Sequence, residues 1–247
     1  MTFDSDAIVI KAQNTGETDR LVTLLTRKYG VIRAFANGAR SPKNKNASAT
    51  SLLCYADFTI TKTAKGICIV KESTPKEMFF SLRSDIIRLS LAQFFAELSG
   101  ELAPREEAAD EFLSLLLNAV YLVADSKKPL QLIKAAAELR MLSLAGYMPS
   151  LLGCAACGAY ETEEMRFCPL SGKLYCADCA PPETFIPVPN SVVHAMRHIC
   201  LSDPGKLFSF RLSDENLLLL CDLSERYLHA ITNKRFATLQ FYKTMTR

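Results

Sequence analysis

The sequence lacks the short motifs that mark most nucleotide-dependent and hydrolytic enzymes. It contains no G-x-x-x-x-G-K-[ST] phosphate loop, no dinucleotide-binding G-x-G-x-x-G, no G-x-S-x-G and no H-E-x-x-H. Only three histidines are present, and the H-x-E element of a zinc deaminase is missing. No set of nucleophile, base and oxyanion donor can be assembled from these residues. We therefore expect no catalytic residues, and an enzyme is the least favoured class.

The sequence also lacks a long hydrophobic run. Its longest apolar stretch, residues 112–124, is interrupted by Ser114 and Asn118 and is shorter than the ~20 residues that a membrane span needs. The first residues include Asp4 and Asp6 and no apolar stretch long enough for a secretory signal. We therefore expect a cytosolic protein without a membrane partner. In that compartment, the nine cysteines indicate metal binding or free buried thiols.

Positive charge is concentrated in the first third of the chain. The whole chain carries 29 Lys and Arg against 26 Asp and Glu, whereas residues 1–80 hold 12 against 7. Residues 27–45 contain six Lys or Arg and no acid. Such a cluster is a candidate surface for phosphate contacts, although solvated loops of many soluble proteins have the same composition.

Short β-branched and alternating runs predict five strands in the first 76 residues. The runs are residues 7–11, 20–26, 31–36, 55–62 and 67–70, with turn signals between them. Five strands in so short a stretch fit a small closed barrel, and the OB-fold is the commonest such barrel that binds single strands. Composition alone leaves an SH3-like barrel open. A polar, basic loop is expected at residues 38–50.

Apolar residues at spacings of three and four predict helices in the rest of the chain. The predicted helices are residues 77–101, 106–124, 130–145, 190–201 and 213–230, with a last one ending near Lys243. Gly146 is placed to end the third as a C-cap glycine. The predicted fold class is α+β. Its domains are an OB-fold barrel at 1–78, a helical domain in two parts at 79–150 and 183–247, and an inserted four-cysteine module at 151–182.

The inserted module contains two C-x-x-C pairs, Cys154–Cys157 and Cys176–Cys179, which are separated by 18 residues. Two residues between thiolates let one tight turn direct both sulfurs at a single ion, and a second turn completes a tetrahedron. We therefore predict one structural Zn²⁺ on these four cysteines. Four sulfur ligands leave no open position for water, so a hydrolytic role is not expected.

Other interpretations of the cysteines and histidines stay open. Four reduced buried cysteines, or one redox-active C-x-x-C pair, would have the same spacing. Cys168 lies between the pairs and can replace a ligand, but its Cys-Pro context favours packing. His194 and His198 share one helix face and form a weaker candidate metal site. The remaining cysteines lie in apolar strand or helix patterns typical of a core; they are Cys54, Cys68, Cys200 and Cys221.

Two stretches of the chain carry extended motifs. The first combines AIVIK at 7–11, GETDRLVTLLT at 16–26, YG at 29–30 and ANGAR at 36–40. The second combines ELRML at 138–142, AGYMP at 145–149 and CAACG at 154–158. In this order they resemble the bacterial RecO family of DNA repair and recombination mediators. Asn37 stands where that family often has Lys, and Ser171-Gly172-Lys173 replaces the usual Gly-Gly.

The resemblance implies an N-terminal OB-fold and a helical C-terminal domain. It also implies binding to single- and double-stranded DNA and annealing of complementary strands. The implied partners are RecR, the tail of single-stranded DNA-binding protein and, indirectly, RecA, which the family helps to load. A protein of this kind would act in the bacterial cytoplasm, associated with the nucleoid. Some members lack the zinc cysteines, whereas this chain keeps all four.

Contacts with DNA are expected on the basic part of the barrel, where neutralised phosphates release counterions and make affinity fall steeply with salt. The predicted DNA-binding residues are Arg20, Arg27, Lys28, Tyr29, Arg33, Arg40, Lys43 and Lys45. Tyr29 and Phe35 are candidates for base stacking, with barrel packing as the alternative, which is favoured for Phe35. The main rival function is a protein–protein interaction module, for example a transcription or translation factor with a zinc ribbon, in which DNA binding is incidental.

Overall fold

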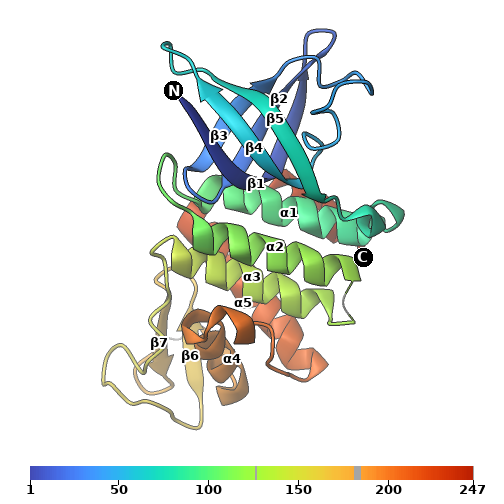
Figure 1. Cartoon of the computed structure of the whole chain (residues 1–247). Helices are drawn as coiled ribbons and strands as arrows, with labels where there is room; N and C mark the ends of the chain where they lie inside the picture. Colours follow the sequence, from blue (N-terminus) through green and yellow to red (C-terminus); the bar gives the residue numbers. More distant parts are fainter. Residues whose placement is uncertain (126, 181–184, 247) are drawn as a thin grey trace. The chain divides into compact units, whose positions relative to one another are not determined.

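The computed structural model describes residues 1–125, 127–180 and 185–246. The chain forms two compact units (Figure 1). The first comprises Met1–Lys127 and Phe236–Arg247, and the second comprises Lys128–Arg235. The C-terminal segment therefore belongs to the same unit as the N-terminal barrel, although more than 100 residues separate the two in the chain.

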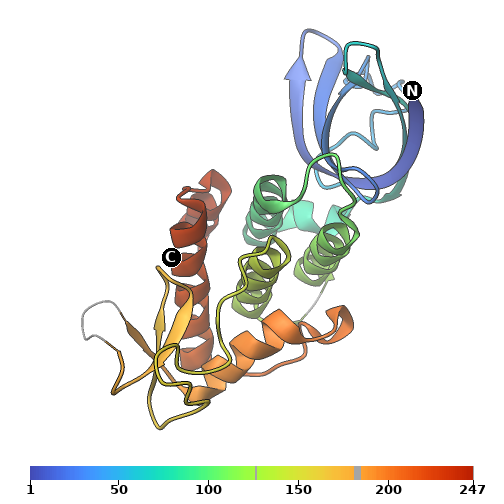
Figure 2. The ribbon, with the colours of Figure 1, turned by 90° about the vertical axis from the view of Figure 1, so that its left-hand side faces the viewer.

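Five strands form a closed barrel in the first unit, as predicted. They are β1 (Thr2–Thr15), β2 (Asp19–Thr26), β3 (Gly30–Ala36), β4 (Tyr55–Lys62) and β5 (Cys68–Glu77). Their order around the barrel is β1-β2-β3-β5-β4, which is the OB-like arrangement, and Figure 2 shows the ring that they make. The β3–β5 pair is parallel and the other pairs are antiparallel.

The alternating pattern of β4 shows why these residues form a barrel. Ala56, Phe58 and Ile60 are buried in the barrel core, whereas the residues between them face outward. Strand β1 closes the ring because it is long enough to pair with β4 through its first half and with β2 through its second half. An irregularity in register at Ile10 bends the strand between these two partners.

The basic loop between β3 and β4 is folded against the barrel. Ala39 and Ala49 are fully buried and belong to the barrel core. Asn46 donates its amide to the carbonyl of Lys71 and accepts a hydrogen bond from Ser73, both of which lie in β5. The loop therefore has an inner side that packs on the barrel and an outer side that carries its charges.

Three helices complete the first unit: α1 (Ile86–Leu102), α2 (Asp110–Asp125) and α6 (Ala237–Met245). The predicted helix at 77–101 was wrong at its start, because β5 continues to Glu77 and a 3-10 turn follows. Helix α1 begins at Ile86 because the Asp85 side chain accepts hydrogen bonds from the backbone N–H groups of Ile87 and Arg88, which have no partner within the helix. Similarly, α2 starts four residues later than predicted, after Glu106 in a left-handed conformation.

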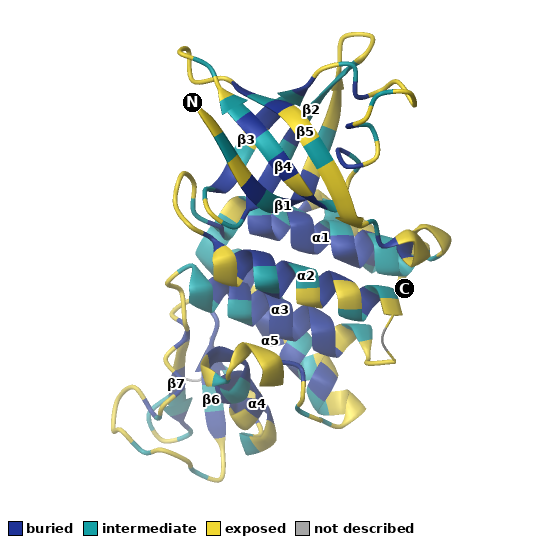
Figure 3. Cartoon of the chain, in the orientation of Figure 1, coloured by how far each residue is buried: buried dark blue, intermediate teal, exposed yellow. Residues whose placement is uncertain are grey.

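The second unit contains α3 (Leu130–Leu144), α4 (Asn190–Leu201), α5 (Asp214–Thr232) and a small sheet. Its strands β6 (Met165–Cys168), β7 (Lys173–Cys176) and β8 (Ile186–Val188) have the order β7-β6-β8. Gly146, with φ 87°, ends α3 as predicted, and the Tyr147 N–H bonds to the Leu142 carbonyl. The helices carry continuous buried faces, drawn dark blue in Figure 3.

The predicted domain limits follow the strand and helix patterns and the cysteine cluster of the sequence, whereas the compact units follow contacts in space. The predicted limit at residue 182 lies outside the described residues. Those at 78 and 150 lie inside the first and second compact units, respectively. The predicted division into a barrel, a two-part helical domain and an inserted module therefore stays a prediction.

Candidate nucleic-acid interface and metal site

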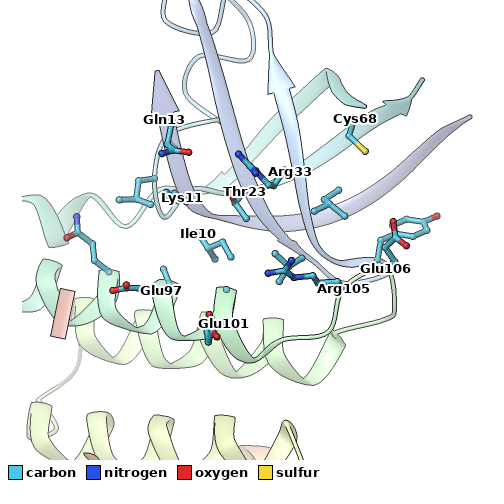
Figure 4. A pocket seen from close by; sticks show the side chains of 18 of the residues that line it. Ile10, Lys11, Gln13, Thr23, Arg33, Cys68, Glu97, Glu101, Arg105 and Glu106 are labelled. Atoms are coloured by element: carbon cyan, nitrogen blue, oxygen red, sulfur yellow. The ribbon is translucent and has the colours of Figure 1, made fainter. Parts of the chain in front are cut away.

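The outer face of the barrel carries a row of three polar side chains. Lys11 of β1, Thr23 of β2 and Arg33 of β3 are direct cross-strand partners in the two pairings. Lys11 and Arg33 are exposed and Thr23 is half-buried, so all three side chains belong to the outward face. Two cations therefore flank one hydroxyl on the barrel surface (Figure 4).

This row lines a cleft of about 1310 Å³ within the first unit. The barrel provides one wall through β1, β2 and β3, and α1 provides another with Gln93, Glu97 and Glu101. Glu97 is held by Thr238 at the start of α6, whose backbone N–H lies 3.2 Å from Oε2. Because the barrel wall carries cations and the α1 wall carries carboxylates, an anion would be attracted to the barrel side.

Most of the predicted DNA-binding residues fall into two groups at opposite ends of β2, and Arg33 lies between them on β3. Arg20 lies at the start of β2 and Arg27 directly after its end. At ~3.3 Å per residue, this strand separates the two positions by roughly 20 Å. Arg40, Lys43 and Lys45 belong to the basic loop at the Arg20 end, and Lys28 and Tyr29 belong to the turn at the Arg27 end.

At the Arg20 end, the arginines also bind the protein itself. Arg20 is half-buried, and its Nη1 donates to the Ala47 carbonyl and the Thr50 hydroxyl, each at 3.1 Å. Arg40 is exposed, but its Nη1 donates to the Gly16 carbonyl at 2.9 Å. Of the two lysines, Lys45 forms an exposed ion pair with Glu72 at 2.5 Å, and Lys43 is exposed.

At the opposite end, Arg27 lies between two carboxylates, those of Asp6 and Asp110. The hydrogen bond to Asp6 raises the pKa of Arg27. Burial raises the pKa of Asp6, but hydrogen bonds from Arg27 and Tyr55 outweigh burial and hold that pKa below its ordinary value. Since two acids already neutralise Arg27, its charge contributes less to an outer phosphate than an exposed lysine does.

The two aromatic candidates for stacking are half-buried. Tyr29 packs on Phe3, with ring centroids 4.3 Å apart, and Phe35 lies on the outward face of β3 one row from Arg33. Each ring therefore has one part exposed on the outside of the barrel. The rest of the Tyr29 ring packs on Phe3, and the rest of the Phe35 ring lies against neighbouring strand residues.

Lys11 and Gln13 were missed as candidate contacts in the sequence. Both are exposed residues of β1 that line the cleft beside Arg33. The available signal was the alternation of the strand, which places residues 11 and 13 on one face. Their proximity to Arg33 depends on the strand register, which the sequence pattern did not reveal.

The four predicted ligands meet in the second unit. Their sulfur atoms all lie within 4.8 Å of one another, and Cys157 Sγ lies 3.8 Å from Cys176 Sγ. A tetrahedral ion with metal–sulfur distances near ~2.3 Å requires sulfurs about 3.8 Å apart. The cluster can therefore hold a metal ion. Among the described residues it is the only group of three or more ligand-type side chains that lie this close together.

Backbone groups around the cluster favour the thiolate form of one ligand. Burial raises the pKa of Cys154, but backbone N–H groups of Cys157, Cys176 and Ala156 outweigh it and lower that pKa to about 6. Conversely, hydrogen bonds with Cys176 and Cys157 raise the pKa of Cys179 to about 12. A bound cation would stabilise all four thiolates and release their protons.

The weaker metal candidates do not join this cluster. Cys168 is buried in β6 and is not part of the four-sulfur group. His194 contacts Glu161 at 2.6 Å, whereas His198 contacts the Lys206 carbonyl at 2.8 Å. The two histidines therefore have separate partners. Cys54, Cys68 and Cys200 are buried as predicted, and Cys221 is partly buried.

No helix in the described part of the chain combines the length and the apolar character required to cross a membrane.

Comparison with known proteins identifies the family. The family model described as "Recombination protein O N terminal" matches residues 1–79, and "Recombination protein O C terminal" matches residues 83–239. The chain is 32% identical to the DNA repair protein RecO of Acetivibrio thermocellus, over 98% of this chain and 97% of that protein. It is 28% identical to DNA repair protein RecO of Symbiobacterium thermophilum, with the same coverage. The chain belongs to the RecO family, and this membership supports a role in DNA repair and recombination.

Proposed function

We propose that this protein is a non-enzymatic recombination mediator that binds single- and double-stranded DNA through its barrel. The observation that carries the proposal is the row of Lys11, Thr23 and Arg33 on the outer barrel face, beside a cleft of about 1310 Å³. Cations attract phosphates without regard to sequence. The basic loop adds a second group of exposed cations, Arg40, Lys43 and Lys45, on the same barrel.

Annealing of complementary strands follows from the same surface. Two strands repel each other through their phosphates, and a positive surface that binds both reduces this repulsion. Base pairing then supplies the driving force, so no catalytic residue is needed. This mechanism requires that the strands are held by their backbones and that their bases stay accessible.

The proposed partners rest on family membership. Family membership suggests three partners: RecR, the tail of single-stranded DNA-binding protein and, indirectly, RecA. The protein would assist the loading of RecA together with RecR. A protein acting with them would work on DNA in the bacterial cytoplasm.

We also propose that the metal is Zn²⁺ and that its role is structural. Four cysteine sulfurs that lie within 4.8 Å of one another are a preferred ligand set for zinc, and as thiolates they leave no coordination position open for water or substrate. The segment around the cysteines buries only a few apolar side chains, among them Met165, Phe167 and Leu174. Metal binding should therefore be coupled to folding of this segment.

The DNA proposal is tested by fluorescence anisotropy of labelled single-stranded and duplex oligonucleotides at several salt concentrations. Lys11→Ala combined with Arg33→Ala should weaken binding to both and reduce the slope of log K against log salt by about 2, because each lost phosphate contact removes about one unit. Arg40→Ala with Lys43→Ala tests the basic loop in the same way.

The matched control is Lys206→Ala with Arg226→Ala, which removes the same charge from exposed positions of the second unit. Its salt slope should stay close to that of the unchanged protein. No DNA binding even at low salt would contradict the proposal and favour the protein-interaction module. An equal loss of affinity in the control would show that net charge alone controls binding.

A further inference from the structure

Arg197 of α4 is a nearly buried arginine, with a side chain 9% exposed, in the second unit. The Tyr160 ring centroid lies 4.1 Å from its guanidinium carbon. The guanidinium donates hydrogen bonds to four acceptors, namely the carbonyls of Leu151 (2.7 Å), Leu152 (3.3 Å) and Tyr160 (3.0 Å) and Oε1 of Glu161 (2.8 Å).

The four acceptors bracket the first cysteine pair. Leu151 and Leu152 precede Cys154, whereas Tyr160 and Glu161 follow Cys157. One guanidinium thus ties together the two ends of a loop whose middle supplies half of the metal ligands. Inside the loop, Cys154 N–H donates to the Ala159 carbonyl and Gly158 N–H donates to the Cys154 carbonyl. The turn is therefore fixed both internally and at its base.

The second cysteine pair is anchored in a different way. Cys176 ends β7, and the β6–β7 hairpin packs against α5 through Phe167, whose ring lies edge-on to Tyr227 at 5.9 Å. Gly172 at the hairpin turn also lies against Tyr227, since a Cβ there would be 2.8 Å from the tyrosine ring. The two halves of the metal site are thus attached to two helices, α4 and α5.

We propose that Arg197 is a positioning residue of the metal site, which holds Cys154 and Cys157 at the spacing that Cys176 and Cys179 require. This inference rests on the proposed zinc site. A ligand turn that is already ordered loses less conformational freedom when the ion binds, so affinity rises and release slows. Only an arginine presents five donors in a planar fork, which is why one side chain can serve four acceptors here.

The experiment compares zinc release from the zinc-loaded full chain to a chromogenic chelator. Arg197→Met, which removes every donor but keeps an apolar stem, should speed release and weaken affinity by about 10–100-fold, the range found when groups that orient metal ligands are removed. Arg197→Lys should fall in between, because an ammonium carries three donors without the fork. The control is Arg226→Met, an exposed arginine of α5 paired with Asp222, and its release rate should not change.

Substitution by Co²⁺ supplies a second readout. The absorption bands of a tetrahedral tetrathiolate site should be altered in Arg197→Met and unaltered in the control. If Arg197→Met does not fold, Glu161→Gln takes its place, because it removes the charge of one anchor and leaves the three carbonyls. Release from Glu161→Gln should then be several-fold faster.

Two results would overturn the inference while leaving the zinc proposal intact. One is a folded variant with an unchanged release rate and unchanged cobalt spectrum. The other is equal destabilisation of the metal-free and zinc-bound forms, since a weaker site has to give a smaller gain in stability on zinc binding. Absence of zinc uptake by the unchanged protein would instead overturn the zinc proposal itself.

Discussion

At the scale of single residues, the surroundings of an arginine decide what it can contribute. Arg197 has four protein acceptors and Arg27 has two carboxylates. Arg20 ties the basic loop to the barrel, whereas Arg33 is exposed at the cleft. Equal charge in the sequence therefore corresponds to different roles. Among these four, Arg33 is the residue we expect to contribute most to DNA affinity.

Gly30 is a residue at which adding a single methyl group should strongly destabilise the first unit. It has φ 61°, and a Cβ would lie 2.1 Å from the Pro104 carbonyl oxygen and 2.8 Å from that of Glu107. Gly30→Ala should therefore destabilise the protein by more than the about 1–3 kcal/mol of a left-handed backbone alone. Urea unfolding followed by circular dichroism measures the change.

The control for Gly30→Ala is Gly66→Ala. Gly66 has φ 80° in the β4–β5 hairpin, and nothing lies within 4 Å of an added Cβ. It should show only the backbone cost, so the difference between the two variants isolates the steric conflict. Equal losses of stability in both variants would contradict the close approach of Gly30 to the segment after α1.

At the scale of elements, α3 and α5 are joined by a buried ionic network. Lys134 and Glu138 of α3 form an ion pair of 2.7 Å with side chains 5% and 0% exposed. Glu225 of α5 lies 3.3 Å from Lys134, and the Ser224 hydroxyl donates to Glu138. Burial raises the pKa of Glu138. The helix pair thus depends on one cation that neutralises two carboxylates.

Lys134→Met should destabilise the protein by about 3–5 kcal/mol near neutral pH, because it leaves Glu138 buried and charged. The folded-state pKa of Glu138 is above that of the unfolded chain, so its contribution is most favourable at low pH and is lost as pH rises through the folded-state pKa. The variant should therefore regain stability as the medium is acidified. Denaturant unfolding at several pH values tests this.

The double variant Lys134→Met with Glu138→Leu should recover most of that stability, because an apolar pair of similar volume removes the fully buried charge of Glu138. Glu225 loses Lys134 in both variants, but it is 16% exposed and has His229 at 3.9 Å. Arg226→Met, which breaks an exposed pair with Asp222, provides a control with a much smaller effect. A double variant as unstable as the single one would show that packing, not charge, causes the loss.

At the scale of the whole molecule, the proposed DNA surface and the metal site lie in different compact units. Cys157→Ser should therefore lose zinc and become less soluble. Removal of zinc from the unchanged protein by a chelator should increase protease cleavage around the cysteine pairs. In both samples, the fraction of protein that stays soluble should bind DNA with nearly unchanged affinity. Metal analysis, limited proteolysis and anisotropy on the same samples measure the three quantities.

Cys168→Ala is the matched control, since Cys168 is a buried cysteine of the same module outside the four-sulfur cluster. It should keep its zinc. Full stability and unchanged proteolysis of the chelated protein would contradict a structural role of the metal. A parallel loss of DNA affinity would show that the metal site acts on the barrel.

Local patterns in the sequence determined the strands, the four-cysteine cluster and the family. Alternation identified the five strands because each has one face in the core, and the C-x-x-C spacing identified the four cysteines that meet because one turn presents both sulfurs. The tertiary structure alone decided which groups meet across the chain. It brought Phe236 of the C-terminal segment to Phe94 of α1, with ring centroids 5.8 Å apart, and placed Lys11 and Arg33 on either side of Thr23. Such contacts depend on strand register and helix packing, which sum many weak interactions between distant residues and leave no periodic signal in the chain.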